Sequence, residues 1–114
     1  KMNKYQIGET DQRSWGTWEV LDAGEGFCLK RLILLPFQKI SKQRHQHRGE
    51  TWIIATGSGR VLIDKTWHHA TPGNVFRIPK QQIHQLESLG EGLTVIELQT
   101  GKTLDEADIE RFPS

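Results

Sequence analysis

The 114-residue chain has 35% hydrophobic and 25% charged residues, a composition typical of one globular domain with a single core. Its 15 Lys and Arg residues nearly balance its 14 Asp and Glu residues, and the basic residues are scattered along the sequence. This pattern argues against nucleic acid as the main partner. The longest apolar run, Leu32 to Phe37, is too short to cross a bilayer, and no basic and apolar leader opens the sequence. We therefore expect a soluble, cytoplasmic protein without a membrane partner.

The predicted elements are short strands. Residues 1–12 are polar and lack periodicity, so we expect an arm there and one domain at 13–114. From Trp15 to Gln99, runs rich in β-branched and aromatic residues alternate with turn residues, which indicates an all-β sandwich or barrel. The expected strands are Gly16–Leu21, Phe27–Leu35, Lys42–His47, Trp52–Thr56, Gly59–Ile63, Asn74–Ile78, His84–Glu87 and Leu93–Gln99. A hairpin turn is expected at Gly57–Gly59 and a second turn at Thr71–Gly73.

The last segment has the signals of a short helix. Thr103-Leu-Asp-Glu106 has the spacing of a capping box and places acidic residues in the first turn. Arg111 lies near the end of the segment, and Pro113 would stop a helix. The pattern predicts one C-terminal helix of about two turns.

Metal-ligand side chains are concentrated in the segment Gln43-Arg-His-Gln-His-Arg-Gly-Glu50, and His84 follows further along. Side chains alternate along a strand, so Gln43, His45 and His47 would share one face, with Glu50 arriving after a short turn. If that face looks into a barrel, each unpaired polar group would cost on the order of 1–3 kcal/mol. A divalent cation would satisfy several of these groups at once. The alternative is a set of buried polar residues that satisfy each other and water.

The spacing of these residues resembles the two motifs of the cupin superfamily, G-x5-H-x-H-x(3,4)-E-x6-G and G-x5-P-x-G-x2-H-x3-N. The second motif is matched in spacing by Gly73, Pro79, Gln81, His84 and Ser88. Gln81 replaces a glycine of the motif, and Ser88 replaces its asparagine. Two spaced motifs together are far more specific than a lone pair of histidines.

The first motif ends at Glu50 and Gly57, but its histidine pair can be placed in two registers. The pair His45-x-His47 leaves two residues before Glu50, one fewer than the superfamily pattern allows. The pair Gln43-x-His45 leaves four residues and fits better. A glutamine in this place is similar to the phosphomannose isomerases, which use glutamine as one ligand. His47 stays open as an alternative to Gln43 or as an acid/base group.

Beyond the motifs, the chain resembles the C-terminal cupin domain of the type II mannose-6-phosphate isomerases. The matching segments are Arg13–Gly16, Leu29–Arg31, Ile40–Gln43, His45–Arg48, Glu50–Trp52, Ile96–Gln99 and Leu104–Arg111. The resemblance implies a cupin-type double-stranded β-helix, which is a jelly-roll barrel. It also implies a divalent metal ion held by Gln43, His45, Glu50 and His84, with zinc as the first candidate and manganese, iron or nickel as others.

The function implied by the resemblance is the metal-dependent isomerisation of mannose 6-phosphate to fructose 6-phosphate. This reaction moves a proton between adjacent carbons, so it needs a base, an electrophile and a cation for the phosphate. Glu97 and His47 are the candidate acid/base residues, and a sugar phosphate is the expected small-molecule partner. The candidate substrate-binding residues are Lys30, Arg31, Arg48, Lys80 and Gln99.

Two other functions stay open. The family pattern continues into a D-x-Y-G-R tail that these 114 residues lack. This favours, as the first alternative, a non-catalytic cupin that binds a sugar phosphate or a sugar nucleotide. A metal-dependent oxygenase is the second alternative. An exposed barrel edge also invites pairing with another copy of the chain, so we expect a homodimer.

Overall fold

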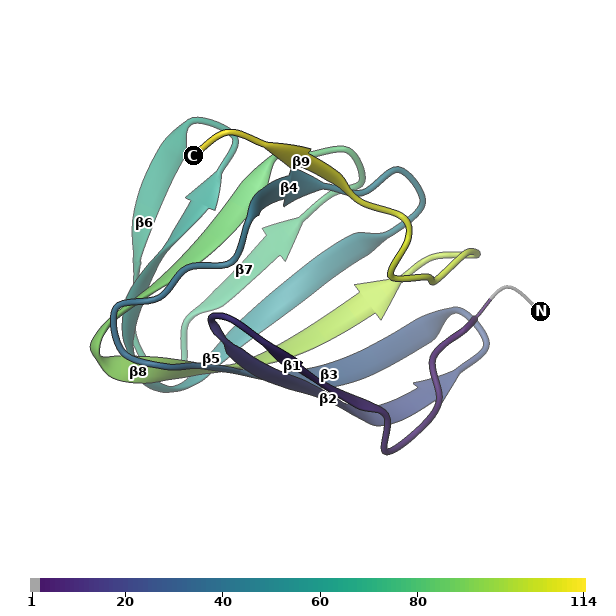
Figure 1. Ribbon diagram of the computed structural model, residues 1–114. Helices are drawn as coiled ribbons and strands as arrows, with labels where there is room; N and C mark the ends of the chain where they lie inside the picture. Colours follow the sequence, from purple (N-terminus) through teal and green to yellow (C-terminus); the bar gives the residue numbers. More distant parts are fainter. Residues whose placement is uncertain (1–2) are drawn as a thin grey trace.

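The computed structural model describes residues 3–114 and folds them into β-strands without a helix. The strands are β1 (Thr10–Arg13), β2 (Gly16–Gly24), β3 (Phe27–Leu34), β4 (Lys42–Arg44), β5 (Gly49–Ile63), β6 (Thr66–Ala70), β7 (Val75–Ile78), β8 (His84–Thr100) and β9 (Glu110–Phe112) (Figure 1). They form one antiparallel sheet that curls around an interior, so the expected all-β jelly-roll fold is confirmed. No helix of these residues is long and apolar enough to cross a membrane.

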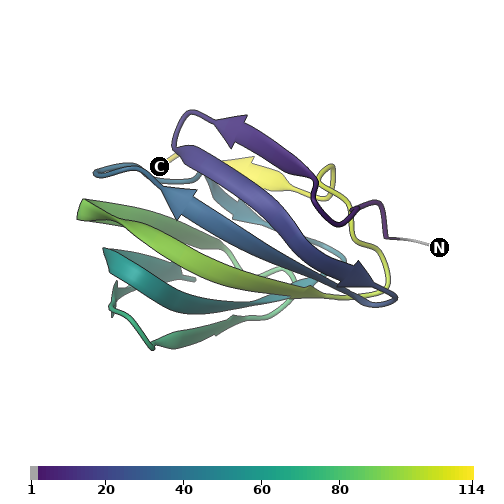
Figure 2. The same cartoon turned by 90° about the horizontal axis from the view of Figure 1, so that it is seen from below.

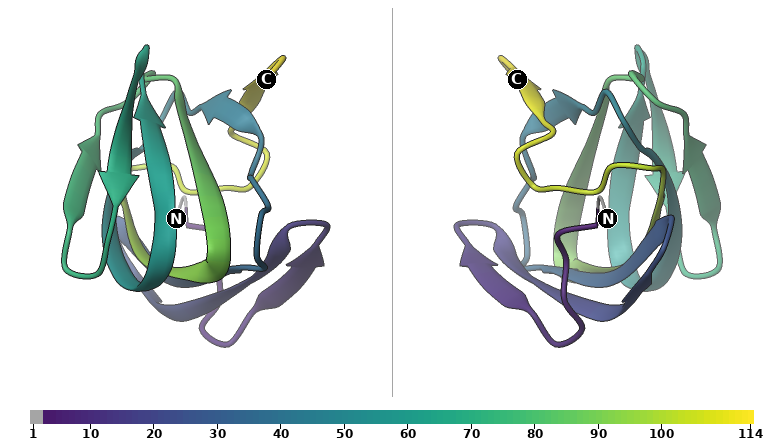
Figure 3. Two further views of the ribbon diagram at one scale, coloured as in Figure 1. Left: turned by 90° about the vertical axis from the view of Figure 1, so that its left-hand side faces the viewer. Right: turned by 90° about the vertical axis from the view of Figure 1, so that its right-hand side faces the viewer.

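The two longest strands, β5 and β8, bend and contribute to both walls of the barrel (Figure 3). The second half of β8 pairs with β3 and with the first half of β5, on the wall that continues through β2 to β1. The first half of β8 pairs with the end of β5 and with β4, on the wall that continues to β9. Figure 2 shows β1, β2, β3, β8 and β5 side by side along the first wall.

The hairpin expected at Gly57–Gly59 is wrong, because this segment is the bend in β5. Gly57 pairs with Leu93 and Gly59 pairs with Ser88, so both strands change direction together while they stay paired. Gly57 has a φ of 91°, and a Cβ built on it would lie 2.1 Å from the carbonyl oxygen of Gly92. The glycine therefore permits a close approach of two backbones instead of a tight reversal.

The second expected turn, at Thr71–Gly73, is confirmed. The backbone N–H of Asn74 donates to the carbonyl oxygen of Thr71 at 3.0 Å, and the Asn74 side chain accepts from the Thr71 backbone N–H at 2.8 Å. Gly73 adopts a φ of 92°, which glycine reaches without steric cost. The turn connects β6 to β7 and places Gly73 in the second sequence motif.

The expected C-terminal helix is wrong, because residues 103–109 form an extended and turned segment that lies over the barrel. Leu104 is fully buried and forms an isolated bridge with Asn3. The Asp105 side chain accepts a hydrogen bond from the backbone N–H of Ala107, which is an Asx turn. Burial of Leu104 and the ion pair of Glu106 with Lys30 replace the capping box, and β9 follows where the helix was expected to end.

The predicted N-terminal arm lies against the barrel in the residues that the structure describes. The backbone N–H of Lys4 donates to the carbonyl oxygen of Leu104 at 2.9 Å, and Tyr5 is only 7% exposed. Thr10 opens β1, which pairs with β2. The N-terminal and C-terminal segments therefore cover the same part of the interior.

The interior face alternates with the solvent face along each strand, as the two-residue period requires. On β2, β3, β5 and β8 it is mainly apolar, with Trp18, Val20, Leu32, Leu34, Ile54, Leu93 and Val95 all buried. One end of the barrel departs from this pattern, since Lys30, Glu50, Glu97 and Gln99 are also buried there. Buried charges need partners, and their position marks the polar end of the barrel as the candidate site.

Candidate metal centre

Three buried side chains, His45, Glu50 and His84, converge at the polar end of the barrel. The Nε2 atom of His45 lies 3.2 Å from Oε2 of Glu50, and the Nε2 atom of His84 lies 3.6 Å from Oε1 of the same carboxylate. One nitrogen or oxygen from each residue falls within 4.8 Å of the others. The Nε2 atom of His84 is buried without a hydrogen-bond partner. An orphaned imidazole nitrogen that faces a carboxylate and a second imidazole is a donor set that fits a divalent metal ion.

The three residues come from different strands that the β4–β8–β5 pairing brings together. His45 follows the end of β4, Glu50 is the second residue of β5, and His84 opens β8. Gln43 on β4 pairs directly with His84. Directly paired residues project from the same face of a sheet, so Gln43 belongs to the same side of the barrel.

Backbone carbonyl groups fix the orientation of both imidazoles. The Nδ1 atom of His45 lies 2.7 Å from the carbonyl oxygen of Asp108, and the Nδ1 atom of His84 lies 2.8 Å from that of Gln82. A carbonyl oxygen only accepts, so each Nδ1 donates and each neutral ring keeps a lone pair on Nε2. Both lone pairs then face Glu50. Burial lowers the pKa of His84, which favours the neutral ring that a metal requires.

A buried arginine completes the polar cluster. The Nε–H of Arg48 donates to Oε2 of Glu50 at 2.9 Å, and its Nη2 lies 3.4 Å from Nε2 of His45. Its Nη1 donates to the carbonyl oxygen of Asp105 at 3.2 Å. Burial raises the pKa of the Glu50 carboxyl, but the Arg48 guanidinium is the largest opposing influence and holds that pKa well below its usual value. Glu50 is therefore ionised, as a metal ligand must be.

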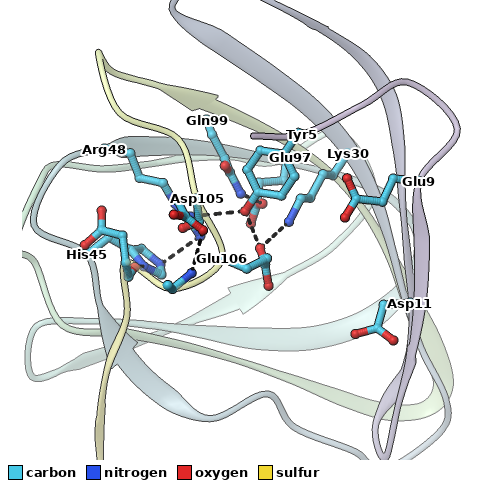
Figure 4. Close-up of polar contacts among 12 residues, drawn as sticks. Tyr5, Glu9, Asp11, Lys30, His45, Arg48, Glu97, Gln99, Asp105 and Glu106 are labelled. Atoms are coloured by element: carbon cyan, nitrogen blue, oxygen red, sulfur yellow. Dashed lines mark hydrogen bonds and ion pairs between the residues drawn. The ribbon is translucent and has the colours of Figure 1, made fainter. Parts of the chain in front are cut away.

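A second carboxyl group, that of Glu97, is buried beside this cluster (Figure 4). Trp52 donates its Nε1–H to Oε1 of Glu97 at 2.9 Å, and Gln99 donates its Nε2–H to Oε2 at 2.7 Å. Burial, and then the negative charge of Glu50, raises the pKa of Glu97. The two buried carboxyl groups thus have pKa values shifted in opposite directions, which is the pattern of a site with one charge-bearing ligand and one proton carrier.

The buried Lys30 forms an ion pair with the more exposed Glu106 next to Glu97. The Lys30 Nζ lies 2.6 Å from Oε2 of Glu106, 4.0 Å from the ring centre of Trp18 and 4.3 Å from that of Tyr5. The Tyr5 hydroxyl also donates to Glu106. Lys30 contacts two aromatic faces and a carboxylate, so its charge is already balanced.

A cleft of about 280 Å³ opens at the polar end of the barrel. Gln43, Arg48 and Glu97 line its inner part. Gln43 pairs with His84, and Arg48 donates a hydrogen bond to Glu50. The charge of Glu50 contributes to the raised pKa of Glu97. Trp15, Trp18 and Leu32 supply apolar surface. A concave site with few convergent polar groups and perturbed carboxyl groups is the usual form of a small-molecule site.

The predicted site residues fall into two groups. The structure brings together His45, Glu50, His84, Gln43, Arg48, Glu97, Gln99 and Lys30 at the polar end of the barrel. It places His47, Arg31 and Lys80 elsewhere. Arg31 pairs with Glu19 at 3.1 Å on the outer face, and Lys80 lines a different cleft with Gly26 and Lys102.

The expectation that His47 faces inward beside His45 is wrong. His47 is exposed, and its backbone N–H donates to Oδ2 of Asp108 at 2.9 Å. The strand ends at Arg44, and the chain bends at Gln46 and His47, so the alternation of a strand no longer applies there.

Three site residues lay outside the sequence-based prediction. Asp108 orients His45, Glu106 balances Lys30, and Tyr5 contacts both Glu106 and Arg48. The acidic residues near position 105 were interpreted as the first turn of a helix. Asp is also favoured in Asx turns, so the acidic residues of this segment were compatible with either a helix or a turn.

The whole chain, residues 1–114, matches the family model "Mannose-6-phosphate isomerase C-terminal". The chain belongs to this family. It is 38% identical over 101 residues to the alginate biosynthesis protein AlgA of Pseudomonas syringae, covering 88% of this chain and 21% of that protein. It is 32% identical over 111 residues to the mannose-1-phosphate guanylyltransferase of Escherichia coli K12, covering 96% of this chain and 23% of that protein. The chain therefore spans about one fifth of the length of these relatives.

Solved structures share the fold at low sequence identity. Bacillus subtilis oxalate decarboxylase, studied for its Mn(II) centres, aligns with a TM-score of 0.77 at 18% identity, over 95% of this chain and 32% of that chain. A cupin-2 domain from Rhodospirillum rubrum aligns with a TM-score of 0.72 at 19% identity, over 95% of this chain and 84% of that chain. These alignments confirm the cupin fold.

Proposed function

We propose that the protein is a metal-dependent isomerase that interconverts mannose 6-phosphate and fructose 6-phosphate. The observation that carries this proposal is the placement of Glu97, a buried carboxyl group with a raised pKa, in the cleft beside the His45–Glu50–His84 cluster. The family to which the chain belongs supports the choice of substrate. The expected homodimer and cytoplasmic location stay predictions.

The proposed metal ligands are Nε2 of His45, the Glu50 carboxylate and Nε2 of His84, with Gln43 as a fourth. Nitrogen and oxygen donors of this kind suit zinc first, and also manganese, iron or nickel. The Mn(II) centres of the oxalate decarboxylase of the same fold support a divalent ion. The metal would polarise the sugar carbonyl and so stabilise the negative charge that develops on it.

Glu97 is the proposed proton carrier. It takes the proton from carbon 2 of the open-chain aldose and delivers it to carbon 1, while the hydroxyl proton at carbon 2 moves to the oxygen at carbon 1. Its raised pKa makes the carboxylate a stronger base than an exposed glutamate. Trp52 and Gln99 each donate one hydrogen bond to it, which leaves lone pairs for the transferred proton and holds the carboxylate in place.

We expect Gln43→Ala to weaken metal binding more than His47→Ala. Gln43 pairs with His84 and lines the cleft, whereas His47 is exposed. Calorimetric titration of each metal-free variant with Zn²⁺ measures the difference. The opposite order of affinities would make His47 a ligand, which would require the segment 45–48 to rearrange.

The proposed activity is tested with mannose 6-phosphate in deuterated water, followed by proton NMR. We expect fructose 6-phosphate to form, and a chelator that removes the metal should stop its formation. Binding without product, and without exchange of the proton at carbon 2, would contradict the isomerase proposal.

One observation favours a second candidate, a cupin that binds sugar phosphate without catalysis. Arg48 donates to Glu50 and approaches Nε2 of His45, so a guanidinium already balances the carboxylate without a metal. In this candidate the cluster is a buried polar network that shapes the floor of the cleft. The NMR experiment separates the two candidates, because only the isomerase exchanges or transfers the carbon-bound proton.

A further inference from the structure

The mouth of the cleft carries three basic side chains that the sequence prediction did not assign to the substrate. Arg13 at the end of β1, Lys39 between β3 and β4, and Arg111 in the middle of β9 all line the cleft. All three are exposed and come from segments far apart in the sequence. The fold therefore gathers three cations around one opening.

The strand register connects this mouth to the candidate metal centre. Gln43 pairs with His84 on one side and with Arg111 on the other, across β8, β4 and β9. Directly paired residues share a face, so the three side chains form a row that begins at the buried His84 and ends at the exposed Arg111. A ligand that reaches Gln43 with one end has Arg111 beside its outward end.

The acidic groups of the cleft do not cancel these cations. Five basic residues (Arg13, Lys30, Lys39, Arg48 and Arg111) and two acidic residues (Glu97 and Glu106) line the cleft. Glu106 is paired with Lys30, and Arg48 is paired with Glu50. Lys30 and Arg48, which the sequence predicted to hold a phosphate, therefore already have carboxylate partners.

The outer cations are available for a ligand. Within residues 3–114, neither Lys39 nor Arg111 lies within 4.0 Å of a carboxylate oxygen of another residue. Arg13 pairs with Asp11 at 3.0 Å, but both side chains are about half exposed. An exposed pair of this kind contributes little stability, so an anion can replace Asp11 at small cost.

We propose that Arg13, Lys39 and Arg111 form a binding site for a phosphate monoester at the mouth of the cleft. This proposal rests on the proposed function, because it assigns the phosphate end of that substrate. A phosphate monoester carries nearly two negative charges at neutral pH and three acceptor oxygens, which suits two guanidinium groups and one ammonium group. The phosphate then binds at the rim, and the carbonyl end of the sugar points to Gln43, Glu97 and the cluster.

The test compares ligands that differ only in the phosphate. Binding of mannose 6-phosphate, mannose and inorganic phosphate to the metal-loaded full chain is measured by two-dimensional amide NMR, with Arg111→Gln, Lys39→Gln and Arg77→Gln as variants. Arg77 is an exposed arginine of β7 that does not line the cleft, so it is the matched control. A lost charge-assisted hydrogen bond should raise the Kd for mannose 6-phosphate about ten- to hundredfold in the first two variants. The Kd for mannose should not change.

The outcomes separate this site from the proposed activity. If inorganic phosphate shifts the amide signals of Arg111 and Lys39 in the parent protein, the proposed phosphate site is supported, even if no isomerisation is detected. Isomerisation with an unchanged KM for mannose 6-phosphate in Arg111→Gln and Lys39→Gln would contradict the proposed phosphate site. It would leave the proposed isomerase activity unaffected. The phosphate site would also be contradicted if Arg77→Gln raised the Kd for mannose 6-phosphate as much as the other two variants do. The same holds if neither mannose 6-phosphate nor inorganic phosphate shifted any amide signal.

Discussion

His84→Ala is expected to abolish stoichiometric binding of a divalent metal ion while the β-barrel stays folded. The Nε2 atom of His84 is the one imidazole nitrogen of the cluster that has no hydrogen-bond partner among the described residues, so metal coordination is the contact it would lose. Loss of residues that only orient a ligand costs about 10- to 100-fold in metal affinity. Loss of a ligand itself should exceed the upper end of that range. Zn²⁺ titration and elemental analysis after dialysis measure the effect.

The fold should tolerate this change because Glu50 keeps its hydrogen bond from Arg48. No unpaired buried charge is created, which is the usual cause of severe destabilisation. His69→Ala is the matched control, because His69 is an exposed histidine of β6. Circular dichroism should show the same β-structure in the parent and both variants. Full metal occupancy in His84→Ala would remove His84 from the ligand set.

The sequence predicted that Glu50 and His84 would lie close together, and both of these residues belong to strands. His84 opens a strand and Glu50 is the second residue of one, and strand alternation together with the motif spacing predicted that they would meet. The same alternation failed for His47, because it was applied beyond the end of β4. The composition of a short strand does not show at which residue the strand ends. Here the bend at Gln46 turns the His47 side chain to solvent.

The outer part of the site could not be predicted because it depends on pairing between distant segments. Arg111 was interpreted as the end of a helix, and only the pairing of β9 with β4 places it beside Gln43. Glu106 fitted a capping box locally, but its pairing with the buried Lys30 satisfies a charge that would otherwise be costly. Tertiary contacts therefore overrode local propensity in the C-terminal segment.

The bend at Gly57 shows the same limit in the first wall of the barrel. Two glycines around one residue are a common hairpin signal, and the sequence around Gly57 gave no reason to prefer another structure. The close approach of Gly57 to the Gly92 backbone is a contact between two strands, which a local pattern does not encode. The prediction of two separate strands there was wrong, although the all-β class did not depend on it.

Glu97→Gln is expected to lower kcat for mannose 6-phosphate isomerisation by about 10²- to 10⁴-fold, the usual contribution of a positioned acid/base group. The amide has nearly the size of the carboxylate and still accepts the hydrogen bond from Trp52. Oε1 of Gln99 is buried without a partner, so a rotation of the Gln99 amide lets that oxygen accept from the new amide group. The metal content and KM should therefore change little. Steady-state kinetics with metal analysis measure all three quantities.

The same variant has an independent readout in its stability. Burial raises the pKa of Glu97 in the folded protein, so the folded state binds more protons than the unfolded state between the unfolded and the folded pKa. The free energy of unfolding therefore falls as the pH rises through this window. Glu97→Gln removes the titrating group, so its stability should fall less than that of the parent protein. Urea unfolding at a series of pH values measures this difference.

A matched control distinguishes a proton carrier from a residue that only fills space. Glu19→Gln changes a carboxyl group that pairs with Arg31 on the outer face and does not line the cleft, and it should leave kcat unchanged. Turnover of Glu97→Gln within about twofold of the parent protein would show that the carbon-bound proton moves without this carboxyl group. If kcat falls but the flattened stability profile is absent, Glu97 is ionised in the folded protein at the same pH as in the unfolded chain, and its basicity is not raised by burial.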